Sequence, residues 1–514
     1  MGLYGLTDTV LRRRTGWQHD PDKVALVFED ERVTYGQLAD RVLRLAAGFA
    51  ARGFRAGDTA AVLLTNRPAY IETVYAVAYL GGVVVPVNYL LRPAEIAYIV
   101  ADSRAGWVIT EERLRAGLAD VTTGRAGDDG DRAVRRVVVD GAHEGELAYD
   151  TLLDHEPTEA PPPTTDSGQR LLLQYTSGTT GFPKGVTHTH GTVLFNALAQ
   201  IVDFDVTSDD VHMVVPSLSW AAGLHCLTLS TLWRGGTVVL KRTGGFTAED
   251  FCALVERDGV TTAMLAPSVV RIILASDAPE RHDMSSLRLV LAGGEPVTAA
   301  EIEQIQRRIP LVRFMQGYGV SEFPSTMVYL DSDQVVRHDG AAGRSSLAAN
   351  VRVVDRSGDD TKPGEHGEIA VRSPQTSGLY HAREGAEASA VVDGWLRTGD
   401  RGFVDEDGHV HVAGRVKEMI ISGGLNVYPA EVERVLQSHV HVREAAVVPV
   451  PDTRYGQVGR AVVVVDDVRR VTPDELDALC RRELAGFKVP RHWVLRTAPL
   501  PRTVTGKIRR FELR

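Results

Sequence analysis

The chain has 514 residues, of which 44% are hydrophobic and 24% charged, a composition typical of soluble globular proteins. This length exceeds what one hydrophobic core usually organises, so two or more domains are expected. The formal net charge of −10 excludes a general nucleic-acid binder, because such proteins need a basic face to neutralise phosphates. A local basic site for a small phosphorylated ligand remains open.

The N-terminal third predicts strands and helices in alternation. VALVFEDERVTY, residues 24–35, predicts two strands around a charged turn. A helix follows, marked by a capping box of Thr34 and Gln37. The uncharged run at 73–91 could be taken for a membrane span. Gly and Pro residues interrupt this run, which favours a short helix followed by a buried strand and no membrane span.

The same alternation continues through the middle of the chain. Residues 56–66 and 235–241 predict strands, and residues 246–260 predict a helix capped by Thr247. Polar or Pro-rich stretches at 122–136 and 155–169 predict loops. Strands alternating with helices indicate an α/β fold with parallel sheets covered by helices.

After Gly414 the pattern changes to short strands and short helices. One of these helices begins at a capping box of Thr472 and Glu475. About a hundred residues of this kind suit a small α+β domain. The boundary is expected near residues 413–418.

The cysteines and the N-terminus bear on the cellular compartment. Cys226, Cys252 and Cys480 share no metal-ligand spacing and are typical of reduced core residues. The N-terminal residues contain no apolar run long enough for a signal peptide. Leu6 stands where a myristoylation signal has Ser or Thr. We therefore expect a cytoplasmic protein.

YTSGTTGFPKGV, residues 175–186, predicts a loop that binds phosphate. Its glycines let backbone amides approach a ligand, its hydroxyls add donors, and Lys184 adds a positive charge. Gly185 follows Lys184 where a Walker motif has Ser or Thr, so the loop is of another kind. A flexible linker is the alternative, but linkers rarely follow a strand directly and carry one fixed lysine.

This stretch resembles the phosphate-loop signature of the adenylate-forming superfamily, which includes acyl- and aryl-CoA synthetases, peptide-synthetase adenylation domains and luciferases. Further segments match the family in its order and approximate spacing. They are LAGGEPV (291–297), QGYGVSE (316–322), WLRTGD (395–400), GRVKEMIISGGLNVYPAEVE (414–433) and PRTVTGKIRR (501–510). The resemblance covers nearly the whole chain.

The resemblance implies a domain organisation. A large N-terminal adenylation domain is expected at 1–414, with parallel-rich sheets and a smaller β-subdomain. A hinge at 415–417 contains Lys417, and residues 418–514 are expected to form a small mobile α+β domain. Hinge function needs only backbone freedom, so no chemistry is assigned to Lys417.

The resemblance also implies a site for ATP. The Tyr318 ring would stack on adenine, and Asp400 would accept hydrogen bonds from the ribose hydroxyls. Glu322 would hold Mg²⁺, which needs few protein ligands, and Arg415 would bind ribose and phosphate oxygens. The expected nucleotide-binding residues are Thr176, Ser177, Gly178, Thr179, Thr180, Gly181, Lys184, Gly294, Glu295, Pro296, Gln316, Gly317, Tyr318, Gly319, Asp400 and Arg415.

The expected catalytic residues are Lys507, Ser321 and Glu322. Ser321 would meet the α-phosphate. Lys507 lies in a Thr/Gly loop, and its ammonium would hold the nucleophile and offset charge developing in the transition state. An ordinary surface lysine is the alternative, and the family match decides against it.

The reaction implied is an ATP-dependent ligation in two steps. A carboxylic acid and ATP give acyl-AMP and pyrophosphate, and CoA then gives acyl-CoA and AMP. Between the steps the C-terminal domain would rotate about Lys417, withdraw Lys507 and present Ser422, Gly423 and Gly424 to the pantetheine channel. ATP, Mg²⁺ and CoA are therefore the expected cofactors.

The acyl pocket should lie beside the nucleotide. Peptide-synthetase domains place an Asp in the stretch aligned here with residues 216–229, which has none. An unpaired ammonium would be costly there, so an α-amino acid is disfavoured. Small side chains favour a bulky cyclic or aryl acid, or a medium-chain acid. The expected lining residues are Trp220, Ala222, Gly223, His225, Ala266, Gly293 and Val320.

Several alternatives remain open. The acceptor could be the phosphopantetheine of a carrier protein, or only one half-reaction could be retained. A non-catalytic nucleotide-binding regulator is a third possibility, and the presence of Lys507 and Glu322 argues against it. The protein is expected to be a monomer or a homodimer.

Four histidines are assigned no chemistry. No Cys or carboxylate is expected to pair with His409 and His411, so a zinc site is not predicted. His188 and His190 follow the phosphate loop and are expected to be structural.

Overall fold

The computed structural model describes residues 4–11, 20–121, 134–161, 163, 165–176, 183–294, 297–335, 337–338, 340–377, 379–382, 390–415, 420–422, 425–484, 486–503 and 508–514. Contacts divide the chain into two units, Met1–Val351 with Val371–Leu396, and Arg352–Ala370 with Arg397–Arg514. The division predicted at 1–414, 415–417 and 418–514 concerns motion about a hinge and stays a prediction. Lys417 lies outside the described residues.

The first unit contains a nine-stranded sheet with the order β16-β15-β14-β13-β12-β10-β11-β1-β2. Its central strands, from β14 to β1, run parallel, and the strands at both edges are antiparallel. The strands are β1 Val24–Phe28, β2 Glu31–Thr34, β10 Val211–Val214, β11 Thr237–Leu240, β12 Thr262–Leu265, β13 Leu289–Gly293, β14 Arg313–Tyr318, β15 Val328–Asp331 and β16 Arg344–Ser345. The central strands are apolar because helices cover parallel sheets on both faces.

A seven-stranded sheet in the same unit has the order β7-β6-β5-β3-β4-β8-β9. Its strands are β3 Thr59–Leu63, β4 Val83–Pro86, β5 Trp107–Glu111, β6 Arg135–Val139, β7 Leu147–Ala148, β8 Arg170–Thr176 and β9 Lys184–Thr189. The uncharged run becomes helix α3 (Pro68–Tyr79) and the buried strand β4, as predicted. Among the helices described, none combines the length and the hydrophobicity that crossing a bilayer requires.

The predicted loop at 122–136 is wrong at its C-terminal end. Residues 122–133 lie outside the described part of the chain, but Arg135 and Arg136 already belong to β6. Arg135 pairs with Trp107 of β5, and its guanidinium lies 5.0 Å from the centre of the indole ring. This contact lets a charged residue begin a strand whose later residues are buried valines.

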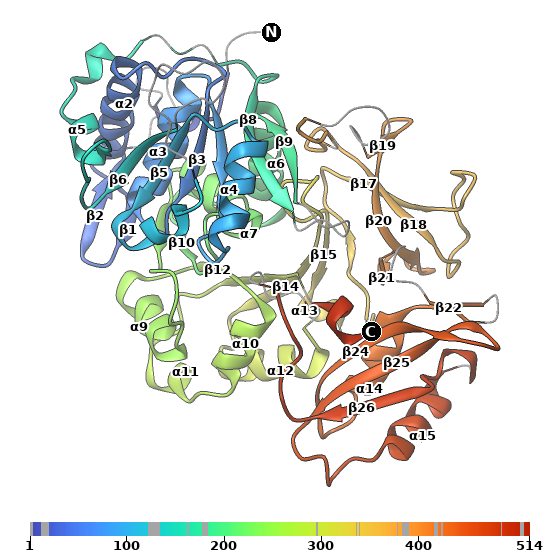
Figure 1. Cartoon of the computed structure of the whole chain (residues 1–514). Coiled ribbons are helices and arrows are strands. Elements are labelled where there is room, and N and C mark those ends of the chain that lie inside the picture. The colour runs from blue at the N-terminus through green and yellow to red at the C-terminus, as the bar shows by residue number, and fades with distance from the viewer. Residues whose placement is uncertain are drawn as a thin grey trace. The chain divides into compact units, whose positions relative to one another are not determined.

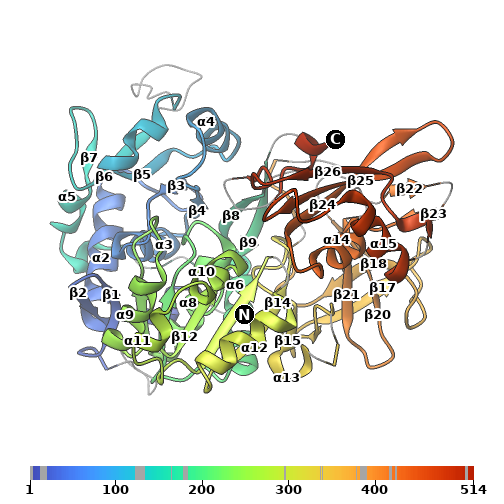
Figure 2. The same ribbon diagram turned by 90° about the horizontal axis from the view of Figure 1, so that it is seen from below.

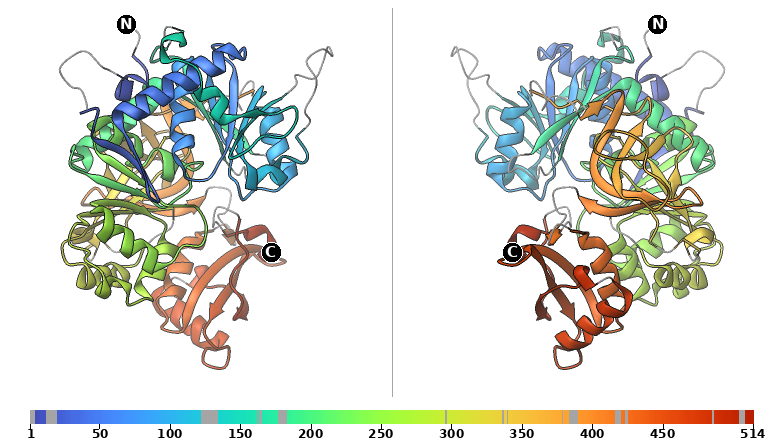
Figure 3. Two further views of the ribbon diagram at one scale, coloured as in Figure 1. Left: turned by 90° about the vertical axis from the view of Figure 1, so that its left-hand side faces the viewer. Right: turned by 90° about the vertical axis from the view of Figure 1, so that its right-hand side faces the viewer.

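The helices of the first unit follow their predicted caps. Thr34 and Gln37 form the predicted capping box of α2 (Tyr35–Ala51), and Thr247 accepts from the Asp250 amide at 3.0 Å. Figures 1 and 2 show α2 beside α3 and α5, and Figure 3 shows α2 as the long dark-blue helix. The remaining helices are α1 Asp8–Leu11, α4 Pro93–Asp102, η1 Glu112–Leu118, α5 Tyr149–Leu153, η2 Pro157–Glu159, α6 His190–Asp203, α7 Ala221–Leu224, α8 Thr228–Arg234, α9 Ala248–Asp258, α10 Pro267–Leu274, α11 Ala278–Arg281, α12 Ala299–Arg308 and α13 Ser332–Val335.

Two five-stranded sheets make up the rest of the fold. In one, β20 pairs with β18, β19 and β21; in the other, β25 is flanked by β24 and β26, and β22 also pairs with β25. Helices α14 and α15 pack on the second sheet (Figure 1), and the predicted Thr472–Glu475 capping box opens α15. The elements are β17 Asn350–Val354, β18 Gly367–Arg372, β19 Val391–Val392, β20 Trp395–Val404, β21 Val410–Arg415, β22 Ile420–Ser422, β23 Leu425–Val427, α14 Pro429–Gln437, β24 Val442–Asp452, β25 Gly456–Val465, α15 Pro473–Glu483, η5 Gly486–Lys488, β26 His492–Arg496 and η6 Arg510–Leu513.

The predicted fold class is confirmed. Parallel-rich sheets with helices form the large N-terminal part, and a smaller β-sheet follows. The C-terminal residues form a further sheet with two helices packed on it, an α+β arrangement. The prediction of reduced core cysteines is also confirmed, because Cys226, Cys252 and Cys480 are free and buried.

Candidate active site

Apart from the predicted phosphate loop, the predicted site residues of the first unit lie at the ends of four neighbouring parallel strands or just after them. Within the nine-stranded sheet, β10 lies beside β12, β12 beside β13 and β13 beside β14. Their carboxyl ends therefore meet at one edge of the sheet, where α/β proteins bind ligands. This edge carries Trp220 to His225 after β10, Ala266 after β12, Gly293 at the end of β13 with Gly294 after it, and Tyr318 at the end of β14 with Gly319 to Glu322 after it.

The segment after β10 is held by polar contacts. Gln174 of β8 donates from Nε2 to the Ser219 carbonyl at 3.0 Å, and the hydroxyls of Ser217 and Ser219 lie 2.8 Å apart. A Cβ on Gly223 would lie 2.1 Å from the Ser217 carbonyl oxygen, so close backbone packing requires glycine here. The half-buried Ala222 packs against the apolar cluster that includes Met264 and Met315.

The glycines of QGYGVSE have a packing reason that the sequence does not show. A Cβ on Gly317 would lie 2.6 Å from the Thr326 methyl carbon, and one on Gly319 would lie 2.1 Å from the Ser325 carbonyl oxygen. The chain returning toward β15 therefore occupies this space. Gln316 is predicted to contact the nucleotide. It also has a structural contact, because its Oε1 accepts from the Val297 amide at 2.9 Å.

The Ser321–Glu322 turn is held by three hydrogen bonds. His188 donates from Nε2 to the Ser321 carbonyl at 2.9 Å, and the Ser377 amide donates to the Glu322 carbonyl at 3.0 Å. The Tyr380 hydroxyl donates to Glu322 Oε1 at 2.6 Å. None of these contacts follows from the motifs, because the partners lie far apart in the sequence. In the sequence, only the GLYHARE stretch around Tyr380 could have drawn attention to this tyrosine.

The predicted phosphate loop joins two strands of the seven-stranded sheet. Thr176 at the end of β8 faces Lys184 at the start of β9, so residues 177–183 connect an antiparallel pair. Lys184 Nζ lies 5.7 Å from the centre of the Tyr380 ring. One tyrosine therefore contacts both a cationic residue of the predicted phosphate loop and the carboxylate predicted to hold Mg²⁺. The residues outside the described part of this loop are Ser177, Gly178, Thr179, Thr180, Gly181 and Phe182.

The second unit contains the predicted ribose residue. Asp400 lies on β20, is 5% exposed, and pairs across the strands with Arg415 of β21. Thr398 Oγ1 accepts from the Asp400 amide at 3.1 Å, which fixes the backbone of Asp400 within the strand. Ser422 lies buried on β22. Outside the described part of the chain lie Glu295, Pro296, Lys417, Gly423, Gly424 and Lys507, and the Arg415 side chain is also not described, so their roles stay predictions.

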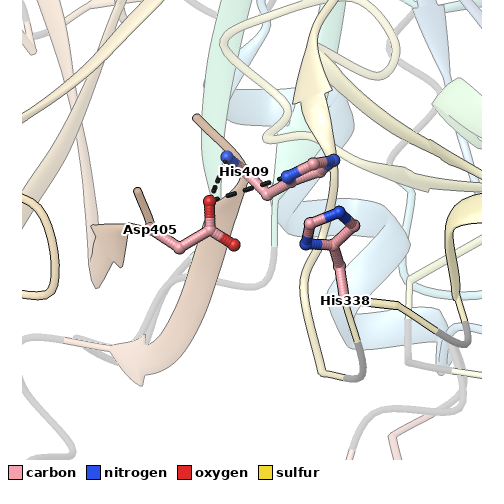
Figure 4. A group of neighbouring side chains, drawn as sticks. All are labelled: His338, Asp405 and His409. Carbon is pink, nitrogen blue, oxygen red and sulfur yellow. Dashed lines mark hydrogen bonds and ion pairs between the residues drawn. The ribbon is translucent and has the colours of Figure 1, made fainter. Parts of the chain in front are cut away.

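The expectation that no carboxylate pairs with His409 and His411 is wrong. Asp405 accepts from His411 Nε2 at 3.0 Å and from the His409 amide at 2.8 Å, and the His409 ring also faces it (Figure 4). Burial alone would raise the pKa of Asp405, but these hydrogen bonds bring it to about 2. The turn between β20 and β21 folds the carboxylate back onto both histidines. His338, drawn in the same figure, belongs to the first unit.

Four buried histidines predict how stability depends on pH. Burial lowers the pKa to about 4 in His188, His190 and His212, and to about 3 in His225. Below the unfolded-state pKa of about 6.5 the unfolded chain binds protons that these folded side chains do not. The free energy of unfolding should therefore fall as the pH decreases from 6.5 toward 4.

His212→Gln tests this expectation. The His212 ring lies buried on β10, 3.0 Å from Thr262 Oγ1. Denaturant unfolding at several pH values measures how the free energy of unfolding changes with pH. Between pH 6 and 4.5 this slope should be smaller in His212→Gln than in the unsubstituted protein by about 1 kcal/mol per pH unit. His143→Gln, at a side chain 66% exposed, should leave the slope unchanged. Equal slopes in His212→Gln and the unsubstituted protein would contradict the expectation.

This architecture is that of adenylate-forming enzymes, with the predicted site segments at one sheet edge, the predicted phosphate loop between β8 and β9, and a small C-terminal α+β part. The family model of the AMP-binding enzyme matches residues 14–381, and that of the AMP-binding enzyme C-terminal domain matches residues 431–507. The chain belongs to the AMP-binding enzyme family, and the resemblance found in the sequence is confirmed.

Similar proteins cover almost the whole chain. A feruloyl-CoA synthase from Amycolatopsis sp is 40% identical over 494 residues, 96% of each chain. An indoleacetate–CoA ligase from Aromatoleum aromaticum is 34% identical over 96% of this chain and 95% of its own. The o-succinylbenzoate CoA synthetase of Bacillus subtilis in complex with its acyl-adenylate intermediate has a TM-score of 0.83 and 31% identity, with 96% of each chain covered. The same enzyme in complex with ATP and magnesium ion has a TM-score of 0.82 and 30% identity, covering 96% of this chain and 97% of that one.

Proposed function

We propose that the protein is an ATP-dependent acid–CoA ligase that acts on an aryl acid through an acyl-AMP intermediate. The observation that carries the proposal is the match along the full chain to a feruloyl-CoA synthase. The other two relatives also bear the names of CoA ligases for acids with an aromatic ring. The name of the B. subtilis complex supports the acyl-adenylate step.

The chain's own residues suit the first half-reaction. Lys184 and the hairpin between β8 and β9 would bind the phosphates of ATP, and the ring of Tyr318 would stack on adenine. The acid's carboxylate attacks the α-phosphorus and pyrophosphate leaves, with Lys507 holding the nucleophile and offsetting charge. In the second half-reaction the CoA thiol attacks the acyl carbonyl and AMP leaves.

Glu322 suits a magnesium ion. It offers one carboxylate beside the phosphate loop, its backbone is fixed through Ser377, and Tyr380 bonds only one of its oxygens among the described contacts. Such a donor set fits Mg²⁺, which takes few protein ligands and completes its shell with phosphate oxygens and water. When bound, the ion would neutralise phosphate charge.

The acyl pocket favours a ring with a polar substituent. Among the described residues, the indole N–H of Trp220, the Gln174 side-chain oxygen and both ring nitrogens of His225 have no hydrogen-bond partner. Buried polar atoms without partners cost free energy, so a ligand group that pairs with them would bind well. Residues 216–229 contain no carboxylate that could hold an amine.

CoA is proposed as the acceptor because the relatives are named for it. A carrier-protein phosphopantetheine is the competing acceptor. We place the enzyme in the cytoplasm, as a monomer or homodimer, with the three free buried cysteines as support for a reducing compartment.

A panel of acids assayed by AMP release tests the proposal. Ferulate, indoleacetate, o-succinylbenzoate, unsubstituted cinnamate, octanoate, acetate and an aromatic α-amino acid would each be offered with CoA or with a carrier protein. The account expects turnover of an aryl acid with CoA, with ferulate above cinnamate. Turnover of acetate alone would overturn the pocket interpretation, and turnover with the carrier protein alone would overturn CoA as the acceptor.

A further inference from the structure

Residues 379–381 lie antiparallel beside β9, the strand that follows the predicted phosphate loop. The Thr187 amide donates to the Leu379 carbonyl at 2.9 Å, and the His381 amide donates to the Gly185 carbonyl at 2.8 Å. Tyr380 forms an antiparallel bridge with Val186 between these two bonds. The backbone around Tyr380 is therefore fixed by β9, the strand that begins with Lys184.

The segment around Tyr380 also contacts the Ser321–Glu322 turn. The Ser377 amide bonds the Glu322 carbonyl at 3.0 Å, while the Tyr380 hydroxyl bonds Glu322 Oε1 at 2.6 Å. Hydrogen bonds to an ionised acceptor are short and directional, so this bond orients the carboxylate plane. Groups that bond a metal ligand in this way commonly set its affinity for the ion.

The face of the Tyr380 ring makes the second contact. Lys184 Nζ lies 5.7 Å from the ring centre, within the range of a cation–π interaction. Lys184 and Glu322 have opposite charges and are the residues to which the proposed function assigns the phosphates and Mg²⁺. Tyr380 contacts both, the cation through its ring and the carboxylate through its hydroxyl.

We propose that Tyr380 is a positioning residue for MgATP, whose hydroxyl orients Glu322 toward the metal ion and whose ring holds Lys184 beside the phosphates. The inference rests on the proposed function for the roles of Glu322 and Lys184. Tyr380 itself touches neither the acid nor CoA in this account. Its removal should therefore change metal and nucleotide binding and leave the KM for the acid unchanged.

The test measures Mn²⁺ binding to the full-length enzyme with a non-hydrolysable ATP analogue, by electron paramagnetic resonance of the free ion. Tyr380→Phe keeps the ring and removes the hydroxyl, and should weaken Mn²⁺ binding roughly 10- to 100-fold. Analogue binding without metal should not change. Tyr380→Leu also removes the ring and should weaken analogue binding in the absence of metal. Tyr79→Phe, on α3, is the matched control and should behave as the unsubstituted protein.

A double-mutant cycle separates positioning from general stability. In a Glu322→Gln background, Tyr380→Phe should have almost no further effect on Mn²⁺ affinity, because the oriented carboxylate is gone. A Tyr380→Phe protein that binds Mn²⁺ normally would overturn the inference, and so would an effect of equal size in the Glu322→Gln background. The readout needs no turnover, so an enzyme that bound MnATP through Tyr380 but ligated no aryl acid would refute the proposed function alone.

Discussion

Lys507→Ala is expected to slow acyl-AMP formation by roughly 10²–10³, the usual cost of losing one preorganised group that stabilises transition-state charge. Transfer of a preformed acyl-AMP to CoA should keep its rate, since the domain rotation would withdraw this lysine before the second step. Rapid-quench measurement of each half-reaction with the same acid would give both rates. The role of Lys507 rests on the TVTGKI motif, because the residue lies outside the described part of the chain.

Lys362→Ala, at an exposed position, is the control and should leave both rates unchanged. Equal slowing of the two half-reactions by Lys507→Ala would contradict the domain alternation. Full adenylation activity in this variant would mean that another group supplies the charge.

Asp400→Asn is expected to raise the KM for ATP roughly 10- to 100-fold, because hydrogen bonds to an ionised group are each worth about 1.5–3 kcal/mol. Asp400 is 5% exposed and its amide is bonded by Thr398, so we expect its carboxylate to be held in place for the ribose hydroxyls. Steady-state kinetics with ATP, 2′-deoxyATP and 3′-deoxyATP would measure the loss.

The unsubstituted enzyme should discriminate against both deoxynucleotides, and Asp400→Asn should largely abolish that discrimination. Asp407→Asn, in the exposed turn between β20 and β21, should preserve it. A variant at position 400 that still prefers ATP by the original factor would show that another residue reads the ribose.

The elements with local signals were predictable from the sequence. The capping boxes at Thr34 and Thr472 each join residues three positions apart, so the pattern itself carries the contact. The start of β6 was not predictable in the same way. Arg135 and Arg136 have the composition of a loop, and Arg135 belongs to a strand through its pairing with Trp107 on the neighbouring strand, whose ring its guanidinium also contacts.

In the site, too, the contacts between residues far apart in the sequence were not predictable. The motif segments after β10, β12, β13 and β14 meet because parallel strands place their carboxyl ends together, which follows from topology. Tyr380 lies 58 residues from Glu322 and His188 lies 133 residues from Ser321, so no short motif could join them. Gly317 and Gly319 are predicted to bind the nucleotide, and the close approach of the returning chain at Ser325 and Thr326 gives a second reason for glycine at these positions.

The missed Asp405 contact is a case where the sequence held a usable signal. An Asp that begins a tight turn often accepts from the backbone a few residues later, and Asp405 accepts from the His409 amide four residues on. The carboxylate was therefore placed to meet both histidines. The turn that begins at Asp405 therefore indicates the contact of Asp405 with His409 and His411 better than the spacing of possible metal ligands does.

One chain is proposed to join an aryl acid to AMP and then to pass the acyl group to CoA. Mass spectrometry of a single turnover with ferulate and ATP would follow both steps. Without CoA we expect feruloyl-AMP on the enzyme in amounts matching the pyrophosphate released, and its conversion to feruloyl-CoA and AMP once CoA is added. Thioester formed with ADP and phosphate, and no adenylate at any time, would contradict this proposal.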